Sequence, residues 1–164
     1  MNLCSRLVQA AAAMGLTVLI MLLPGIGRAE PGSNPFSVLL GSWGGTGDYK
    51  LRDGTTERMK CNAYYTGGGS RLGMAIRCSS PNNKIEIRSK LTQSGGRITG
   101  SWEERTYNAE GSATGRATGN KLTLQISGAV TGTMSVTYTR TRQSVSISME
   151  GTPLSSVNVT LSRS

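Results

Sequence analysis

The sequence predicts an all-β domain, an antiparallel up-and-down meander of about ten strands that forms a closed or flattened barrel. Two observations predict this class. The chain has 164 residues, 22 of them glycine and one of them phenylalanine, a composition typical of short strands and turns. Turn signals also recur at nearly even intervals, and apolar residues alternate with polar ones between them. The length favours a single domain.

The first 29 residues have the layout of a secretory signal peptide. Arg6 supplies a positive charge, residues 10–23 form an apolar run, and Gly27-Arg28-Ala29 gives a small-x-small cleavage pattern. A membrane anchor is the alternative, but this run is shorter than the ~18 apolar residues of a spanning helix. We therefore expect a signal peptide over 1–29, a linker over 30–36 and a barrel domain over 37–164, in the periplasm or secreted, and not spanning a membrane.

Cleavage would leave a basic chain with two cysteines. Without Arg6 and Arg28, the 18 Lys+Arg fall to 16 against 9 Asp+Glu, a net charge of about +7. Cys61 and Cys78 remain, and an even pair in an exported chain predicts a disulfide. Two buried free thiols are the alternative, which an oxidising compartment disfavours.

The hairpin between residues 59 and 78 tests the register. Aligning the apolar residues across the Gly67-Gly68-Gly69 turn pairs Tyr65 with Met74 and Cys61 with Cys78. Directly opposed residues of this kind approach closely enough for a disulfide. In the preceding hairpin, a three-residue turn with Gly54 in the left-handed conformation pairs Gly45 with Cys61.

The same alignment continues along the chain. The further expected partners are Ile76–Ile87, Leu72–Leu91, Leu91–Ile98, Ile87–Trp102, Ala117–Leu122, Leu124–Val136, Leu122–Tyr138, Val136–Ile147, Ile147–Val159 and Val145–Leu161. Strands with one apolar face must bury that face, and closing the sheet also removes its exposed edges. We favour a barrel over a sandwich. Charged outward positions such as Arg58 and Lys60 argue against an outer-membrane barrel, whose outer face meets lipid.

The tripeptide Gly41-Ser42-Trp43 resembles the Gly-x-Trp opening of the calycins, the group that includes the lipocalins and the fatty-acid-binding proteins. The resemblance implies that Trp43 plugs one end of the barrel and that an arginine on the last strand packs over it, for which Arg163 is the candidate. The strand count is nearer to the fatty-acid-binding branch, whereas the Cys61–Cys78 link is not a lipocalin hallmark.

Catalytic signals are weak. With no histidine in the chain, the usual base for a serine or cysteine nucleophile and the usual metal ligand are missing. Glu103 and Glu104 are adjacent in a strand, so they point to opposite faces and cannot act on one substrate. We expect no enzymatic activity, no metal and no cofactor. Nucleic acid is not expected as a partner, since Tyr64 alone interleaves the basic residues.

Two binding hypotheses follow. The first is a small apolar ligand inside the barrel, near Trp43, Trp102 and Leu124, with Tyr138 and Arg140 at the mouth holding a carboxylate, as similar residues do in fatty-acid-binding barrels. A flattened barrel with a filled interior is the alternative.

The second hypothesis is an anionic envelope surface, or a protein partner, bound by a basic outer face. That face consists of Arg58, Lys60, Arg71, Arg77, Lys84, Arg88 and Lys90, with Glu86 as its one expected acid. Charges of one sign attract anions over about a Debye length. A solvated face with an Arg77–Glu86 pair is the alternative. The function predicted is therefore that of a non-catalytic exported binding protein.

Overall fold

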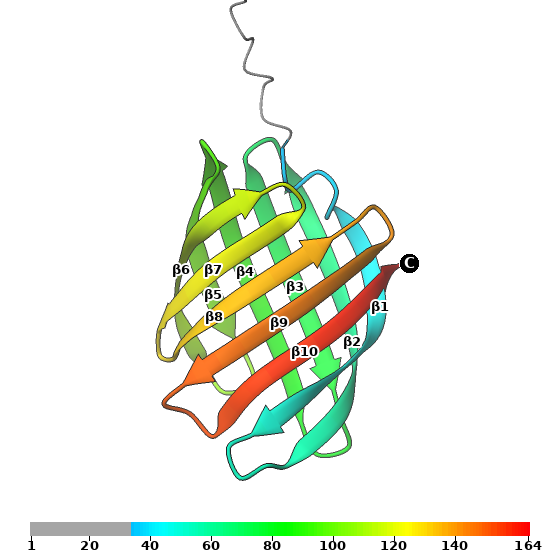
Figure 1. Cartoon of the computed structure of the whole chain (residues 1–164), viewed down its shortest axis with the longest axis vertical. Helices are drawn as coiled ribbons and strands as arrows, with labels where there is room; N and C mark the ends of the chain where they lie inside the picture. The colour runs from blue at the N-terminus through cyan, green and yellow to red at the C-terminus, as the bar shows by residue number, and fades with distance from the viewer. Residues whose placement is uncertain (1–33) are drawn as a thin grey trace, which may run out of the picture.

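The computed structural model describes residues 34–164, so the expected signal peptide and most of the expected linker lie outside it. Ten strands follow one another along the chain (Figure 1). They are β1 (Gly41–Leu51), β2 (Thr56–Gly68), β3 (Arg71–Ser79), β4 (Lys84–Ser94), β5 (Arg97–Glu104), β6 (Ala109–Thr118), β7 (Lys121–Gly128), β8 (Thr131–Tyr138), β9 (Arg142–Glu150) and β10 (Leu154–Arg163).

The strands form a closed up-and-down barrel, as predicted. Each strand is antiparallel to its neighbours in sequence, and β10 pairs with β1 from Trp43↔Arg163 to Leu51↔Leu154. In Figure 1 the wall formed by β7–β10 crosses in front of the wall formed by β2–β5. Closure pairs both edges of the described sheet, which removes the sites at which other chains add strands.

Three of the predicted registers are confirmed in the hairpins whose turn chemistry is unambiguous. Cys61 lies opposite Cys78, and Ala117 lies opposite Leu122 across the two-residue Gly119-Asn120 turn. Gly45 lies opposite Cys61, with Gly54 at φ 94° in the connecting turn. The predicted β3–β4 pairs are also observed.

Four other predicted registers are wrong by two residues. The β4–β5 hairpin turns at Gly95-Gly96, with φ of 56° and 78°, so Trp102 lies opposite Ser89 instead of Ile87. The β7–β8, β8–β9 and β9–β10 pairs are displaced in the same way: Leu122↔Val136, Val136↔Val145 and Ile147↔Val157. A shift of two keeps every side chain on its own face, so the apolar pattern cannot distinguish these registers. The inward set is therefore as predicted.

The segment before β1 belongs to the core. Phe36 is 0% exposed and Leu39 is 1% exposed, and both join the buried cluster around Trp43. The Trp43 indole N–H donates to the Leu39 carbonyl at 2.7 Å. Phe36 falls at the last position of the expected linker, and the structure instead places it inside the barrel domain. Its prolines and glycine made the segment look like a linker, although it contains the chain's one phenylalanine.

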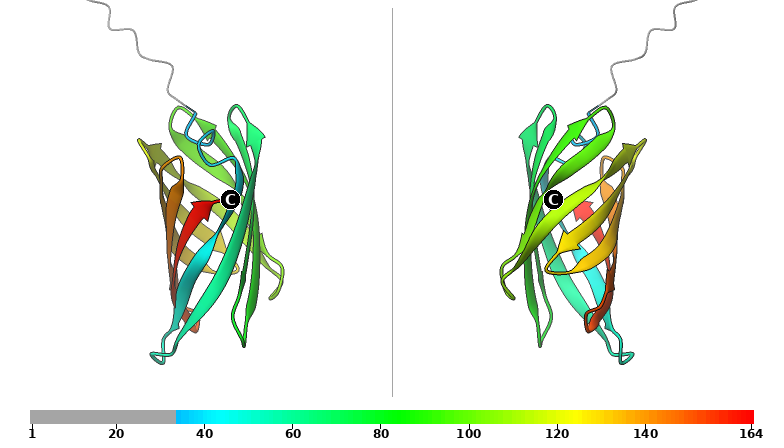
Figure 2. Two further views of the ribbon diagram at one scale, coloured as in Figure 1. Left: turned by 90° about the vertical axis from the view of Figure 1, so that its right-hand side faces the viewer. Right: turned by 90° about the vertical axis from the view of Figure 1, so that its left-hand side faces the viewer.

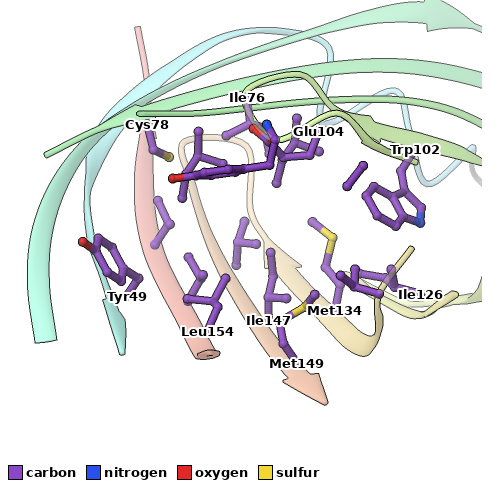
Figure 3. Close-up of a pocket in the computed structure, with 18 of the residues that line it drawn as sticks. Tyr49, Ile76, Cys78, Trp102, Glu104, Ile126, Met134, Ile147, Met149 and Leu154 are labelled. Carbon is purple, nitrogen blue, oxygen red and sulfur yellow. The ribbon is translucent and has the colours of Figure 1, made fainter. Parts of the chain in front are cut away.

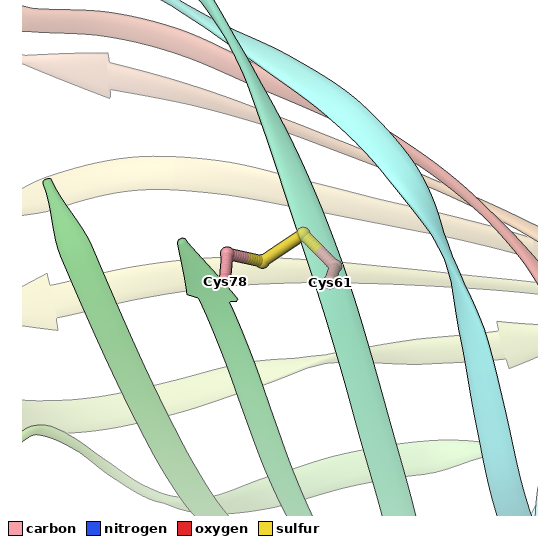
Figure 4. Close-up of a disulfide and its surroundings, with 2 residues drawn as sticks. All are labelled: Cys61 and Cys78. Atoms are coloured by element: carbon pink, nitrogen blue, oxygen red, sulfur yellow. A yellow bond between two sulfur atoms is a disulfide. The ribbon is translucent and has the colours of Figure 1, made fainter. Parts of the chain in front are cut away.

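Cys61 and Cys78 form the predicted disulfide between β2 and β3 (Figure 4). Their Cα atoms are 4.1 Å apart, the spacing of a non-hydrogen-bonded pair of opposed strand residues. Both side chains are buried on the inner face. The disulfide therefore links two adjacent strands, β2 and β3, that are already paired by backbone hydrogen bonds.

We expect Cys61→Ala/Cys78→Ala to lower the free energy of unfolding by about 2–4 kcal/mol, because the bond closes a short loop in the unfolded chain. Urea unfolding followed by tryptophan fluorescence measures the change, with exposed Ser42→Ala on β1 as the control. An unfolding midpoint equal to that of the native protein would contradict this.

Candidate functional site

The two ends of the barrel differ in the segments that they carry. The closed end carries residues 34–40, the β2–β3, β4–β5, β6–β7 and β8–β9 connections, and the end of β10. The open end carries the other connections, which follow β1, β3, β5, β7 and β9. Phe36, Leu39 and Trp43 fill the interior at the closed end. Space inside the barrel is therefore left toward the open end.

A cavity of about 540 Å³ occupies that space. Its lining includes a residue at or beside every open-end connection, such as Asn83 and Tyr107, so it reaches the rim there. Its walls are almost wholly apolar (Figure 3). The apolar wall residues include Met59, Met74, Ile76, Ile85, Ile87, Leu124, Ile126, Met134, Val145, Ile147, Met149 and Val157. Small-molecule sites in proteins have this size and character.

One polar side chain lies deep in this apolar wall. Ser89 is 7% exposed and lines the cavity, between Met74 on β3 and Trp102 on β5. Its hydroxyl is not among the fully buried polar atoms that lack a hydrogen-bonding partner within residues 34–164, and Ser89 lines the cavity. A hydroxyl both donates and accepts, so a polar group of a bound molecule could hydrogen-bond to it. The signal was present in the sequence, since Ser89 interrupts the inward series of Ile85, Ile87 and Leu91.

The remaining polar groups gather at the rim. The Asn83 amide donates to the Tyr49 hydroxyl, and the Tyr107 hydroxyl donates to the Asn83 side-chain oxygen at 3.0 Å. The Glu104 carboxylate accepts the Glu86 N–H at 2.9 Å and the Tyr107 N–H at 2.6 Å. The sequence contained no signal for Asn83 and Tyr107, because they lie in connections whose path only the fold decides.

The predicted ligand-binding residues divide between the two ends. Trp102 and Leu124 line the cavity, whereas Trp43 is part of the closed-end plug. Tyr138 is buried at the closed end, where its hydroxyl lies 3.4 Å from the Gly119 carbonyl and burial raises the pKa of its phenol. Arg140 is exposed in the β8–β9 connection.

The mouth expected at Tyr138 and Arg140 is therefore at the wrong end. In an up-and-down meander the β8–β9 connection lies at the same end as the start of β1, where Trp43 and the preceding segment fill the interior. Neither Tyr138 nor Arg140 lines the cavity. The sequence did contain a signal for this, because Trp43 lies at the start of the first strand. A tryptophan that fills one end of the barrel leaves no opening for a ligand at that end.

Arg163 confirms what the calycin resemblance implied. Its guanidinium lies over the Trp43 ring, 4.3 Å from the centroid. It also donates to the Leu40 and Arg140 carbonyls, both at 2.7 Å, and to the Val38 carbonyl. One side chain thus ties the last strand to the first strand, to the segment before it and to the β8–β9 connection.

The basic outer face is exposed along β2–β4, but it is less uniform than the sequence suggested. Glu86 pairs with Arg88 at 2.8 Å and, as predicted, with Arg77 at 3.3 Å. Hydrogen bonds from Arg77 and Arg88 hold the pKa of the Glu86 carboxyl below its ordinary value.

The strands flanking this face add two more acids. Arg58 lies opposite Asp48 on β1, and Arg88 lies opposite Glu103 on β5. Lys60, Arg71, Lys84 and Lys90 have no acidic residue directly opposite. Sequence reasoning considered β2–β4 alone and so missed the neighbouring carboxylates. These carboxylates weaken the positive electrostatic potential of the basic outer face.

Comparison with known proteins shows the fold. The structure resembles that of Rv2717c from M. tuberculosis, with a TM-score of 0.69 and 19% identity over 82% of this chain and 98% of that one. It also resembles the S-type phycobiliprotein lyase CPES from Guillardia theta, with a TM-score of 0.54 and 14% identity over 79% of this chain and 90% of that one. No family model and no curated protein matches the chain. This chain therefore has the fold of a small, lipocalin-like antiparallel barrel.

Two kinds of feature are absent from residues 34–164. No helix there is long and apolar enough to cross a membrane. No group of three or more His, Cys, Asp or Glu side chains in that range is arranged to hold a metal ion.

Arg163→Ala should destabilise the protein by about 1–3 kcal/mol, because it removes the stacking on Trp43 and the bonds to backbone carbonyls. Arg163→Lys should recover little of this, since an ammonium lacks the planar fork that both contacts use. Urea unfolding measures both variants. Equal stability of Arg163→Lys and the native protein would rule out the proposed role of the guanidinium.

The Glu57 carboxylate at the rim makes the stability of the protein depend on pH. Its carboxylate accepts hydrogen bonds from the Asn82 amide at 2.6 Å and the Ser80 hydroxyl at 2.7 Å, and these lower the pKa of the Glu57 carboxyl. Its contribution to stability is full above the ordinary glutamate pKa of about 4.3 and is lost as pH falls through the lower folded value. An NMR titration should show a midpoint below 4.3 that rises in Ser80→Ala/Asn82→Ala. An unshifted midpoint in both proteins would refute the contact.

Proposed function

We propose that this protein is a non-catalytic binding protein that carries a small apolar molecule inside its barrel. The observation that carries this proposal is the cavity of about 540 Å³, apolar along its walls and reaching one end only. Ligand sites typically have volumes of about 300–1,000 Å³ and a few placed polar groups. Burial of apolar ligand surface would supply most of the binding free energy, at about 25 cal/mol per Å².

The cavity favours an uncharged or cationic ligand over a carboxylate. Glu104 is the charged side chain in the described lining, and no Lys or Arg joins it there. An anionic head group would meet a like charge at the rim and would find no cation to pair with in the apolar wall. The carboxylate expected from the fatty-acid-binding resemblance therefore lacks its partner in this barrel.

Ser89 adds a second restriction on the ligand. Its hydroxyl lies within the apolar wall, whereas Glu104, Asn83 and Tyr107 lie at the rim. A ligand with a hydroxyl, carbonyl or amide placed to reach Ser89, and an apolar body otherwise, fits this distribution. A neutral lipid-like molecule is the class that we propose.

The surroundings of Ser89 support a carrier over an enzyme. Its neighbours across the adjacent strands are Met74 and Trp102, neither of which can remove a proton from the hydroxyl. A serine nucleophile needs an adjacent base. We also propose that the protein acts in the periplasm or outside the cell, where a buried disulfide such as Cys61–Cys78 persists.

Native mass spectrometry of the protein purified from its own host tests the carrier function directly. Leu124→Trp narrows the cavity, while Thr123→Trp places the same side chain on the outer face of β7. We expect a small molecule retained by the native protein and by Thr123→Trp, and lost from Leu124→Trp. A bare native mass, or equal retention by both variants, would rule out the cavity as the site.

A matched pair of ligands tests the proposed class. A long-chain alcohol should displace a fluorescent apolar probe at lower concentration than the fatty acid of the same length. Glu104→Gln should reduce the difference in affinity between the alcohol and the fatty acid. Ser89→Ala should weaken the binding of the alcohol by about five- to tenfold, which corresponds to the loss of one hydrogen bond. Tighter binding of the fatty acid would refute the class while leaving the carrier function intact.

A further inference from the structure

The charged side chains of the barrel are segregated along its axis. Of the nine Asp and Glu residues in the chain, Glu30 lies outside the described residues and the other eight lie toward the open end. Each is in an open-end connection or within four residues of one: Asp48, Asp53, Glu57, Glu86, Glu103, Glu104, Glu110 and Glu150. Basic residues such as Arg52 and Lys84 lie among them, so the open end is mixed in sign.

Within residues 34–164, the closed end is basic only. Its charged side chains are all exposed and all positive: Arg71, Arg97, Arg116, Lys121, Arg140, Arg142 and Arg163. Among the described residues, no Asp or Glu side chain lies at this end. Arg97 and Arg116 even lie directly opposite each other on β5 and β6, an arrangement that destabilises a sheet. We call this set the basic cap.

The basic cap is a rim and not a stripe. Its members stand at or beside the four connections of the closed end and at the end of β10, so they encircle the barrel axis. A ring of charges around an axis can approach a flat surface with all of its members at once. A linear polymer would instead follow charges along the side of the barrel, where acids on β1, β4 and β5 weaken the field.

The chain before the described residues joins the barrel at the same end. Residues 34–40 lie over the closed end (Figure 2), and the 33 residues before them contain the apolar run of residues 10–23. A leader of this kind is removed in the mature protein. The charges of the basic cap must therefore supply the attraction to a bilayer.

We propose that the basic cap binds an anionic lipid bilayer through the head groups. Lys and Arg near such a surface each strengthen binding by roughly fivefold, and the attraction fades beyond a Debye length. Exposed apolar residues are not part of the cap, so it lies on the head groups without inserting. Docked in this way, the barrel would direct its open end, and the mouth of its cavity, away from the bilayer into the aqueous phase.

Sedimentation with lipid vesicles tests the proposal on the exported protein. We compare vesicles of phosphatidylcholine alone with vesicles that also contain phosphatidylglycerol. The cap variant is Arg97→Gln/Arg116→Gln/Lys121→Gln/Arg142→Gln, which leaves Arg163 on Trp43 untouched. The control variant, Arg58→Gln/Lys60→Gln/Lys84→Gln/Lys90→Gln, removes the same charge from the side of the barrel.

We expect the native protein and the control to bind only the anionic vesicles, and binding to fall as salt is raised. The cap variant should lose affinity on the order of several hundredfold. Equal losses of affinity in the two variants would show that binding depends on the net charge of the protein and not on the basic cap, which would overturn the proposal. The absence of binding by the native protein would overturn it as well. Salt-sensitive binding to polyglutamate but not to anionic vesicles would assign the cap to an acidic polymer or protein instead.

Discussion

The structure depends on one constraint: a sheet with one apolar face must bury that face, and this sheet does so by closing on itself. The β1–β10 pairing achieves the closure, and the alternation along every strand then decides which side chains meet inside. The same closure places Arg163 opposite Trp43 and so brings its guanidinium onto the Trp43 ring. Removing the pairing would expose the apolar face and both edges together.

The plug at the closed end gives the barrel its direction. Phe36 and Leu39 pack beneath Trp43, whose indole is held by the Leu39 carbonyl, and Arg163 covers the ring. Because these bulky groups fill one end, the medium-sized residues of the other strands leave a cavity at the opposite end. A barrel of ten strands encloses more space than its side chains fill. Because Phe36, Leu39 and Trp43 occupy the closed end, the unfilled space lies toward the open end.

The proposed ligand and surface preferences follow the same axis. The cavity opens among carboxylates, one of which lines it, whereas within residues 34–164 the plugged end carries cations alone. The open end is thus suited to admitting a neutral or cationic apolar molecule, and the closed end to resting on anions. A carrier built in this way would hold its cargo away from the surface on which it rests, so that the two binding sites do not compete.

The sequence by itself determined which side chains face inward, the closed meander and the disulfide, because a period of two and the chemistry of tight glycine turns are local properties. It also indicated Arg163 over Trp43, through a resemblance. Only the tertiary structure decided the two-residue shifts of four registers, since such shifts leave every face unchanged. It alone placed Phe36 in the core, moved the mouth away from Tyr138 and Arg140, and gathered the cations of separate connections into one cap. These features depend on which ends of the strands meet, and a strand's own residues do not specify that.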